Sequence, residues 1–127
     1  MLHASMYFRF GRDARPEVTA ATTFDAILAG QRTATTRFPA WPGHARWLAL
    51  APGDRVTFYA DRDMRGRSVV CEITHPPLAI DLATCGEAEI ETWSQREGWT
   101  VSAGRGFGRR YGSGTQIRYR VLQAAGG

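Results

Sequence analysis

Five short segments of this chain carry the residue pattern of β-strands, and they do not alternate regularly with helix patterns. In the clearest segment, residues 115–122, apolar Ile117, Tyr119 and Val121 alternate with polar residues, as in a half-buried strand. A parallel sheet would need a crossover helix after each strand. The pattern therefore predicts an α+β fold, with a small curved sheet of about five or six strands that closes toward a barrel. The other predicted strands are residues 1–10, 33–38, 55–60 and 67–74.

Two or three short helices are expected to flank this sheet. One prediction spans residues 24–29, after two candidate N-cap threonines and before Gly30. Another spans the acidic residues 87–97 and ends before Gly98. Hydroxyl side chains favour helix starts, and glycine favours the position just after a helix.

The acidic helix places a carboxylate where an apolar side chain is expected. Ile90, Trp93 and Glu97 follow at spacings of three and four residues, which puts all three on one helix face. Glu97 either turns to solvent at the helix end or points into a site. We therefore take Glu97 as a candidate acid or base.

The charge of the chain is unusual in kind and in distribution. The net charge is +4 over 127 residues, and all sixteen basic residues are arginine. Arginine stays protonated, so it can bind anions but cannot act as a neutral base. Residues 102–120 hold five arginines and no carboxylate, whereas residues 81–97 hold five carboxylates and one arginine. This basic strip predicts an anionic partner.

Two stretches are predicted to be long loops. Residues 39–51 carry Trp41, which either packs in the core or stacks on a base. Residues 102–114 are rich in glycine and arginine, which is typical of a flexible loop that contacts a single strand, or of a solvated loop. If residues 102–114 contact a single strand, we expect Arg109 and the following Arg118 to contact the ligand.

Several classes of protein are not indicated. Cys71 and Cys85 do not make a disulfide framework, and with the three histidines they show no metal-ligand spacing. No dinucleotide or phosphate-loop motif and no membrane-spanning run is present, and we expect no signal peptide because the first residues lack its basic, apolar and small-residue zones. We expect one cytoplasmic domain over residues 1–127, with a frayed tail after residue 122, no metal or other cofactor, and no membrane contact. The oligomeric state stays open.

The most informative segment is FDAILAGQRTATTRF, residues 24–38. A short helix stops at a glycine and leads directly into a strand that bears hydroxyls and arginines. Arg32 lies at the turn, while Thr33, Thr35 and Arg37 share one face of the expected strand. Such a corner offers hydroxyl and guanidinium donors to a small polar ligand. The alternatives are that the threonines are only β-formers and that Arg37 pairs with Glu97.

This segment resembles the signature of the ASCH domain family, a branch of the PUA-like fold. PGDRVTFYADRD and QIRYRVL resemble the family's "GD" turn with its strand and its last strand, so the resemblance covers residues 22–122. It implies a small β-barrel with flanking helices and a cleft that binds RNA or nucleotides. Some members remove acetyl from N4-acetylcytidine, and others have been linked to ribonuclease activity.

In the amidohydrolase branch the resemblance points to a lysine, a threonine three residues later and a glutamate near the end of the acidic helix. The matching positions here are Arg32, Thr35 and Glu97, with Arg37 as the arginine that closes the motif. Arginine in place of lysine cannot deprotonate the threonine. Either Glu97 acts as the base, or the chain has kept the pocket without the chemistry.

The leading prediction is therefore binding of RNA or a modified, cytidine-like nucleoside in a cleft lined by Arg32, Thr35, Arg37 and Glu97. The alternative is an amidohydrolase acting on N4-acetylcytidine with Arg32, Thr35 and Glu97 as catalytic residues. Ribonuclease activity and a non-catalytic interaction module are ranked below these two functions. Further ligand contacts are predicted from Thr33, Trp41, Arg109 and Arg118.

Overall fold

The computed structural model of the protein describes residues 1–7, 20–60 and 64–125. These residues form six strands and four helices. The strands are β1 (His3–Tyr7), β2 (Ala34–Arg37), β3 (Arg55–Tyr59), β4 (Ser68–Ile73), β5 (Leu78–Asp81) and β6 (Ser113–Ala125). The helices are α1 (Ala20–Leu28), α2 (His44–Leu48), α3 (Glu87–Glu97) and α4 (Val101–Tyr111).

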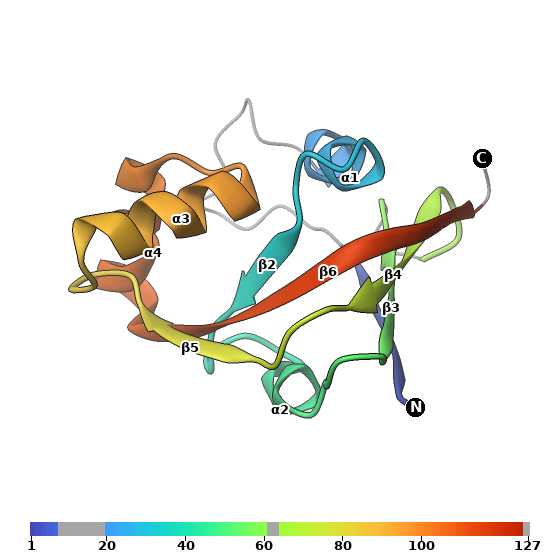
Figure 1. Ribbon diagram of the computed structural model, residues 1–127, viewed down its shortest axis with the longest axis horizontal. Coiled ribbons are helices and arrows are strands. Elements are labelled where there is room, and N and C mark those ends of the chain that lie inside the picture. The colour runs from blue at the N-terminus through green and yellow to red at the C-terminus, as the bar shows by residue number, and fades with distance from the viewer. Residues whose placement is uncertain (8–19, 61–63, 126–127) are drawn as a thin grey trace.

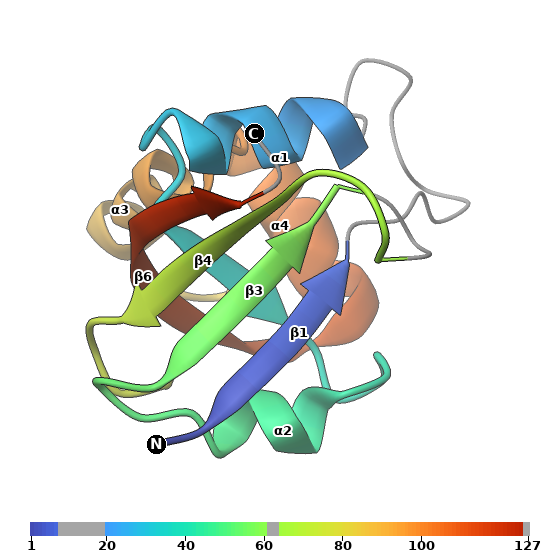
Figure 2. The same ribbon diagram turned by 90° about the vertical axis from the view of Figure 1, so that its right-hand side faces the viewer.

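The strands form one mixed sheet in the order β1-β3-β4-β6-β2, with β5 on the other edge of β6. β1 runs parallel to β3, and the other pairs are antiparallel. The sheet curls into a half-barrel, with α3 and α4 together at one end and α1 and α2 at opposite rims (Figures 1 and 2). This architecture confirms the predicted α+β class and the predicted number of strands.

β6 joins the two halves of the sheet. Its first part lies between β2 and β5, and its second part, residues 119–125, pairs with β4, with a register shift between Val70 and Cys71. Residues 123–125 pair with residues 68–70. The prediction of a frayed tail from residue 123 is therefore wrong up to residue 125, because β4 supplies backbone partners there.

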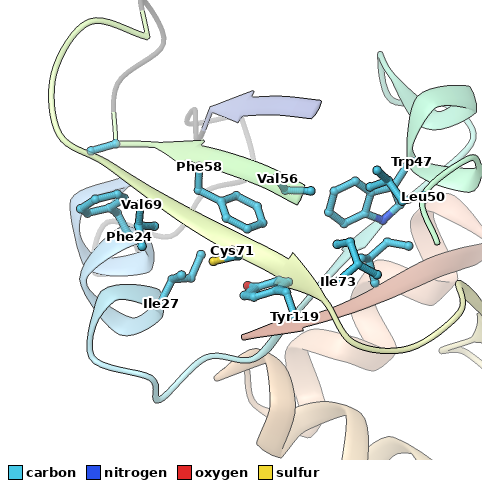
Figure 3. Packing of buried hydrophobic residues seen from close by; sticks show 12 residues of the cluster. Phe24, Ile27, Trp47, Leu50, Val56, Phe58, Val69, Cys71, Ile73 and Tyr119 are labelled. Atoms are coloured by element: carbon cyan, nitrogen blue, oxygen red, sulfur yellow. The ribbon is translucent and has the colours of Figure 1, made fainter. Parts of the chain in front are cut away.

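The main core fills the concave side of the half-barrel (Figure 3). Phe58 of β3 and Tyr119 of β6 lie with ring centroids 4.8 Å apart, and Ile27 of α1 and Trp47 of α2 pack into the same cluster. Cys71 is fully buried there, and burial raises the pKa of its thiol to about 12. It is a small core residue, as its strand position predicts.

A second cluster lies between the sheet and the last two helices. Phe38, Ile80, Leu82, Ile90 and Trp93 form its buried centre. α3 has the predicted bounds and ends at the left-handed Gly98, with φ of 74°. Its apolar stripe is buried, as the spacing predicts, so this cluster fixes where the end of α3 lies.

The largest correction concerns residues 102–114, because most of this predicted loop is helix α4. The hydroxyl of Thr100 caps the helix by accepting from the backbone N–H of Ala103 at 3.1 Å. Gly104 lies against the ring of Trp93, and Gly108 lies against the backbone of Leu82. These glycines allow close packing and do not mark a flexible loop, so tertiary contact outweighs their low helix propensity.

Other differences are smaller. The predicted loop 39–51 contains α2, β5 was not predicted, and α1 begins at Ala20 rather than at residue 24. The count of four helices also exceeds the predicted two or three. The predicted residues 8–10 of the first strand, most of the connection 11–21 and the hairpin residues 61–63 lie outside the described residues. Across the described ranges, no helix is both long and apolar enough to cross a membrane.

Candidate functional site

A buried ion pair joins two segments that lie 65 residues apart in the chain. Arg32 follows the turn after α1, and Glu97 is the last residue of α3. Arg32 Nη2 lies 3.3 Å from Glu97 Oε1, and only 6% and 3% of the two residues are exposed. Arg32 Nε also donates to the carbonyl oxygen of Ala34 at 3.0 Å, which holds the guanidinium beside β2.

Three more donors reach the Glu97 carboxylate. The backbone N–H of Thr36 donates to Oε1 at 3.2 Å, its hydroxyl donates to Oε2, and Gln116 Nε2 donates to Oε2 at 3.0 Å. An ionised carboxylate offers about four acceptor positions. With Arg32 included, each oxygen has two donors, so the positions that a general base would use are occupied in this structure.

Trp93 determines how the Thr36 hydroxyl is oriented. Its indole Nε1, which can only donate, lies 2.9 Å from Thr36 Oγ1. The hydroxyl therefore accepts from Trp93 and gives its own proton to Glu97. Sequence reasoning had selected Thr35, yet it is the neighbouring Thr36 that contacts the carboxylate.

Thr35 faces the other side of β2, because successive residues of a strand point to opposite faces. Its Oγ1 lies 2.9 Å from the hydroxyl of Tyr119 in the main core. Burial raises the pKa of Tyr119 well above its ordinary value, against the opposing effect of the charge on Arg32. The structure therefore brings Arg32 and Glu97 together and places Thr35 beside Tyr119.

A hollow of about 420 Å³ opens between β1, the end of β2 and α2. We call it the β1–α2 hollow. Four consecutive residues of β1 line it, which shows that the strand faces it with an edge and not with one face. Figure 2 shows β1 at the margin of the sheet with α2 below it. The described lining residues are Ala4, Ser5, Met6, Tyr7, Arg37, Pro42, Gly43, Arg46, Trp47 and Met64.

The predicted ligand contacts fall in different places. Arg37 is half-buried, lines the hollow, and has its guanidinium 6.0 Å from the ring centroid of Trp41. Trp41 is half-buried and packs edge-on against Phe38 and Tyr111, at centroid distances of 5.0 and 5.3 Å. Arg37 is thus the predicted contact that reaches the hollow, and the Trp41 ring is held against the second cluster.

The other three predicted contacts lie away from the described lining of the hollow. Thr33 is exposed, and its backbone bridges the Arg96 carbonyl and the Tyr119 N–H, each at 2.9 Å. Arg109 is exposed in the last turn of α4. Arg118 is half-buried on β6, where burial and the neighbouring Arg96 lower its pKa.

Sequence reasoning missed Thr36, Gln116 and Arg46. Ala34 and Thr36 share a strand face opposite Thr35, so strand parity offered Thr36 as the alternative hydroxyl. Gln116 lies at a polar position of the predicted strand 115–122, and the sequence does not indicate which residue its side chain contacts. Arg46 lay in a predicted loop with no period that could place it. Among the described residues, no three His, Cys, Asp or Glu side chains are placed to hold a metal ion.

Comparison with known proteins bears on the fold. No family model matches the sequence, and no curated protein matches it. Among solved structures, an ASCH domain from Lactobacillus crispatus is 17% identical, with a TM-score of 0.63 over 94% of this chain and 79% of that chain. Protein EF3133 from Enterococcus faecalis is 13% identical, with a TM-score of 0.62 over 98% and 83% of the two chains. A variant of ZmASCH from Zymomonas mobilis is 16% identical, with a TM-score of 0.58 over 94% and 68%.

The curled mixed sheet with its covering helices therefore defines a small α+β domain. Within this class, the fold is the ASCH-type fold of the structures from Lactobacillus crispatus and Zymomonas mobilis. The resemblance drawn from residues 22–122 is confirmed at the level of the fold.

Proposed function

We propose that the protein binds RNA or a modified nucleoside, with the base and ribose in the β1–α2 hollow. The observation that carries this proposal is the hollow itself. Its volume of about 420 Å³ lies within the range of about 300–1,000 Å³ typical of small-molecule sites. Arg37 links it to the segment that the sequence singled out.

The edge of β1 supports recognition of a base. β1 is the terminal strand of the sheet order, and no described strand pairs with its second edge. Such an edge presents backbone N–H and C=O groups in alternation. These are the donors and acceptors that a nucleobase edge requires, and the half-buried Tyr7 lies beside them.

The buried ion pair has a supporting role in this proposal. Arg32 and Glu97 are almost inaccessible, and Thr36 and Gln116 supply the remaining donors to the Glu97 carboxylate. They hold the end of α3 against β2 and so fix the strand that delivers Arg37. Direct contact with the ligand is assigned to Arg37 and not to Glu97.

The proposal is tested by titrating the protein with cytidine, N4-acetylcytidine and a short single-stranded RNA in a calorimeter at low salt. We expect binding, and we expect Arg37→Gln to weaken it about tenfold or more, because a hydrogen bond to a charged group contributes about 1.5–3 kcal/mol. The matched control is Arg120→Gln, since Arg120 is exposed and pairs with Glu72 at 3.1 Å. Failure of all three ligands to bind, or an equal loss in both variants, would contradict the proposal.

A second candidate, amide hydrolysis of N4-acetylcytidine, is favoured by one contact. A hydroxyl bonded to a carboxylate, as in Thr36 and Glu97, is the arrangement of a nucleophile with its base. The three other donors on Glu97, from Arg32, the Thr36 backbone and Gln116, argue against it because they stabilise the carboxylate without a proton, and we expect N4-acetylcytidine to bind without turnover. The assay follows release of acetate by the parent protein and by Thr35→Val and Thr36→Val. Turnover that only Thr36→Val abolishes would establish the hydrolase and replace the simpler proposal.

A further inference from the structure

Two arginines approach each other where the end of α3 lies over β6. Arg96 is in the last turn of α3, and Arg118 shares a face of β6 with Gln116, two residues before it. Arg96 Nη1 donates to Gln116 Oε1 at 3.4 Å, which places the Arg96 guanidinium on that same face. Both arginines are half-buried. Burial and then the charge of Arg96 lower the pKa of Arg118, as expected of two neighbouring cations.

The fold holds the two arginines in this position. The carbonyl oxygen of Arg96 accepts from the N–H of Thr33, whose own carbonyl accepts from the N–H of Tyr119, each at 2.9 Å. One residue therefore links the end of α3 to β6. Gln116 is only 1% exposed, and its Nε2 donates to Glu97 at 3.0 Å, so its Oε1 stays directed toward Arg96. The like charges are thus brought together by tertiary structure.

No carboxylate of the described chain neutralises this pair. Neither Arg96 nor Arg118 forms an ion pair there. Two carboxylates occur on the neighbouring elements, and both are engaged: each oxygen of Glu97 has two donors, and Glu72 pairs with Arg120 at 3.1 Å. Like charges held together disfavour each other, and a bound anion would remove that cost.

The surrounding charges favour a small anion over an extended polyanion. Glu89 and Glu91 lie within about two helical turns of Arg96, are exposed, and form no ion pair with the described residues. Glu72 lies on the neighbouring strand, opposite Arg120. A long polyanion would bring further negative groups toward these carboxylates, whereas a discrete anion would not.

We infer that Arg96 and Arg118 form an anion site between α3 and β6, which takes a small divalent oxyanion such as sulfate or a dicarboxylate. The site is separate from the β1–α2 hollow, whose described lining includes neither arginine. Each guanidinium presents a planar N–H fork that can donate paired hydrogen bonds to an oxyanion. The bound anion offsets the repulsion between the cations and ties α3 to β6, so its binding stabilises the fold.

The test is thermal unfolding at constant ionic strength, with sodium sulfate replacing sodium chloride. We expect the melting temperature to rise with a saturable dependence on sulfate, by about 3–6 °C at about ten times the dissociation constant. Sulfate also stabilises proteins in general because it is excluded from their surface, but that effect does not saturate. Sodium succinate is titrated in the same way. A saturable rise with either anion supports the site, and the tighter anion shows whether one tetrahedral group or two carboxylates fit better.

Arg96→Gln and Arg118→Gln should each remove the saturable rise. At low salt without sulfate, Arg118→Gln should melt at the parent temperature or above it, because the substitution removes the repulsion. A lower melting temperature would be the sign of a merely structural role. Arg118→Lys should retain part of the rise, because lysine binds anions as a point charge. The matched control is Arg109→Gln, which makes the same change in charge at an exposed position of α4 and should retain the full rise.

Two results would overturn the inference and leave the β1–α2 hollow unaffected. The first is a linear rise of equal size in the parent protein and in both glutamine variants, because exclusion of sulfate would then explain it. The second is a loss of affinity for single-stranded RNA in both variants, because the arginines would then belong to a track for a polyanion. The hollow is tested separately, through Arg37→Gln.

Discussion

Replacing Glu97 with glutamine is expected to lower the free energy of unfolding by about 3–5 kcal/mol, the usual cost of removing one partner from a buried ion pair. The substitution leaves the Arg32 guanidinium without its counter-charge at a position that is 6% exposed. It also places an amide NH₂ among groups that already donate, namely Thr36 and Gln116. Urea denaturation followed by circular dichroism measures the loss.

The matched control is Asp25→Asn. Asp25 and Arg67 form an ion pair at 2.7 Å, shorter than that of Glu97, but the side chains of both are more than half exposed. Exposed pairs contribute about 0–1 kcal/mol, so we expect little change. If both substitutions cost less than about 1 kcal/mol, the Glu97 carboxylate is not buried against Arg32, and the site described here is incorrect.

A second large effect is expected in α4, where Gly108→Ala should destabilise the protein by about 3 kcal/mol. A Cβ at this position would lie 2.2 Å from the backbone nitrogen of Ala83 and 2.6 Å from the carbonyl carbon of Leu82. Overpacking of this kind is costly, and backbone atoms cannot rotate away as a flexible side chain can. The same denaturation measurement gives the size of the effect.

Gly106→Ala, in the same helix, should have the opposite sign. The nearest atom to its added Cβ is Arg109 Nη2 at 3.9 Å, which is ordinary contact. Alanine exceeds glycine in helix propensity by about 0.5–1 kcal/mol, so this variant should be more stable than the parent protein. If residues 101–111 formed a loop, both substitutions would have small effects, and the helix would be disproved.

The sequence predicts those elements whose signals are local. α3 has the predicted bounds because acidic residues open it and Gly98 closes it. Alternation in residues 115–122 likewise predicted most of β6. α4 could not be predicted in this way, because Gly104 and Gly108 read as loop residues until their contacts with Trp93 and Leu82 are known. At five and four residues, α2 and β5 are too short to show a period.

In the candidate site, too, the residues with a local sequence signal could be predicted and the others could not. Glu97 stood out because a carboxylate at an apolar position needs a reason, and its burial against Arg32 supplies one. The choice between Thr35 and Thr36 depended on which face of β2 meets α3, which a single strand does not reveal. The hollow could not be foreseen, since it arises where the edge of β1 meets α2, and that arrangement depends on the long-range pairing of β1 with β3.

The central position of β6 has a consequence for how the chain acquires its structure. β2, β4 and β5 all pair with β6, although each of them is made before it. On the ribosome, β4 can already pair with β3, but β2 and β5 pair with no other described strand and stay unpaired until β6 has emerged. The half-barrel therefore closes in one late event, and the nascent chain is most prone to aggregation just before that event.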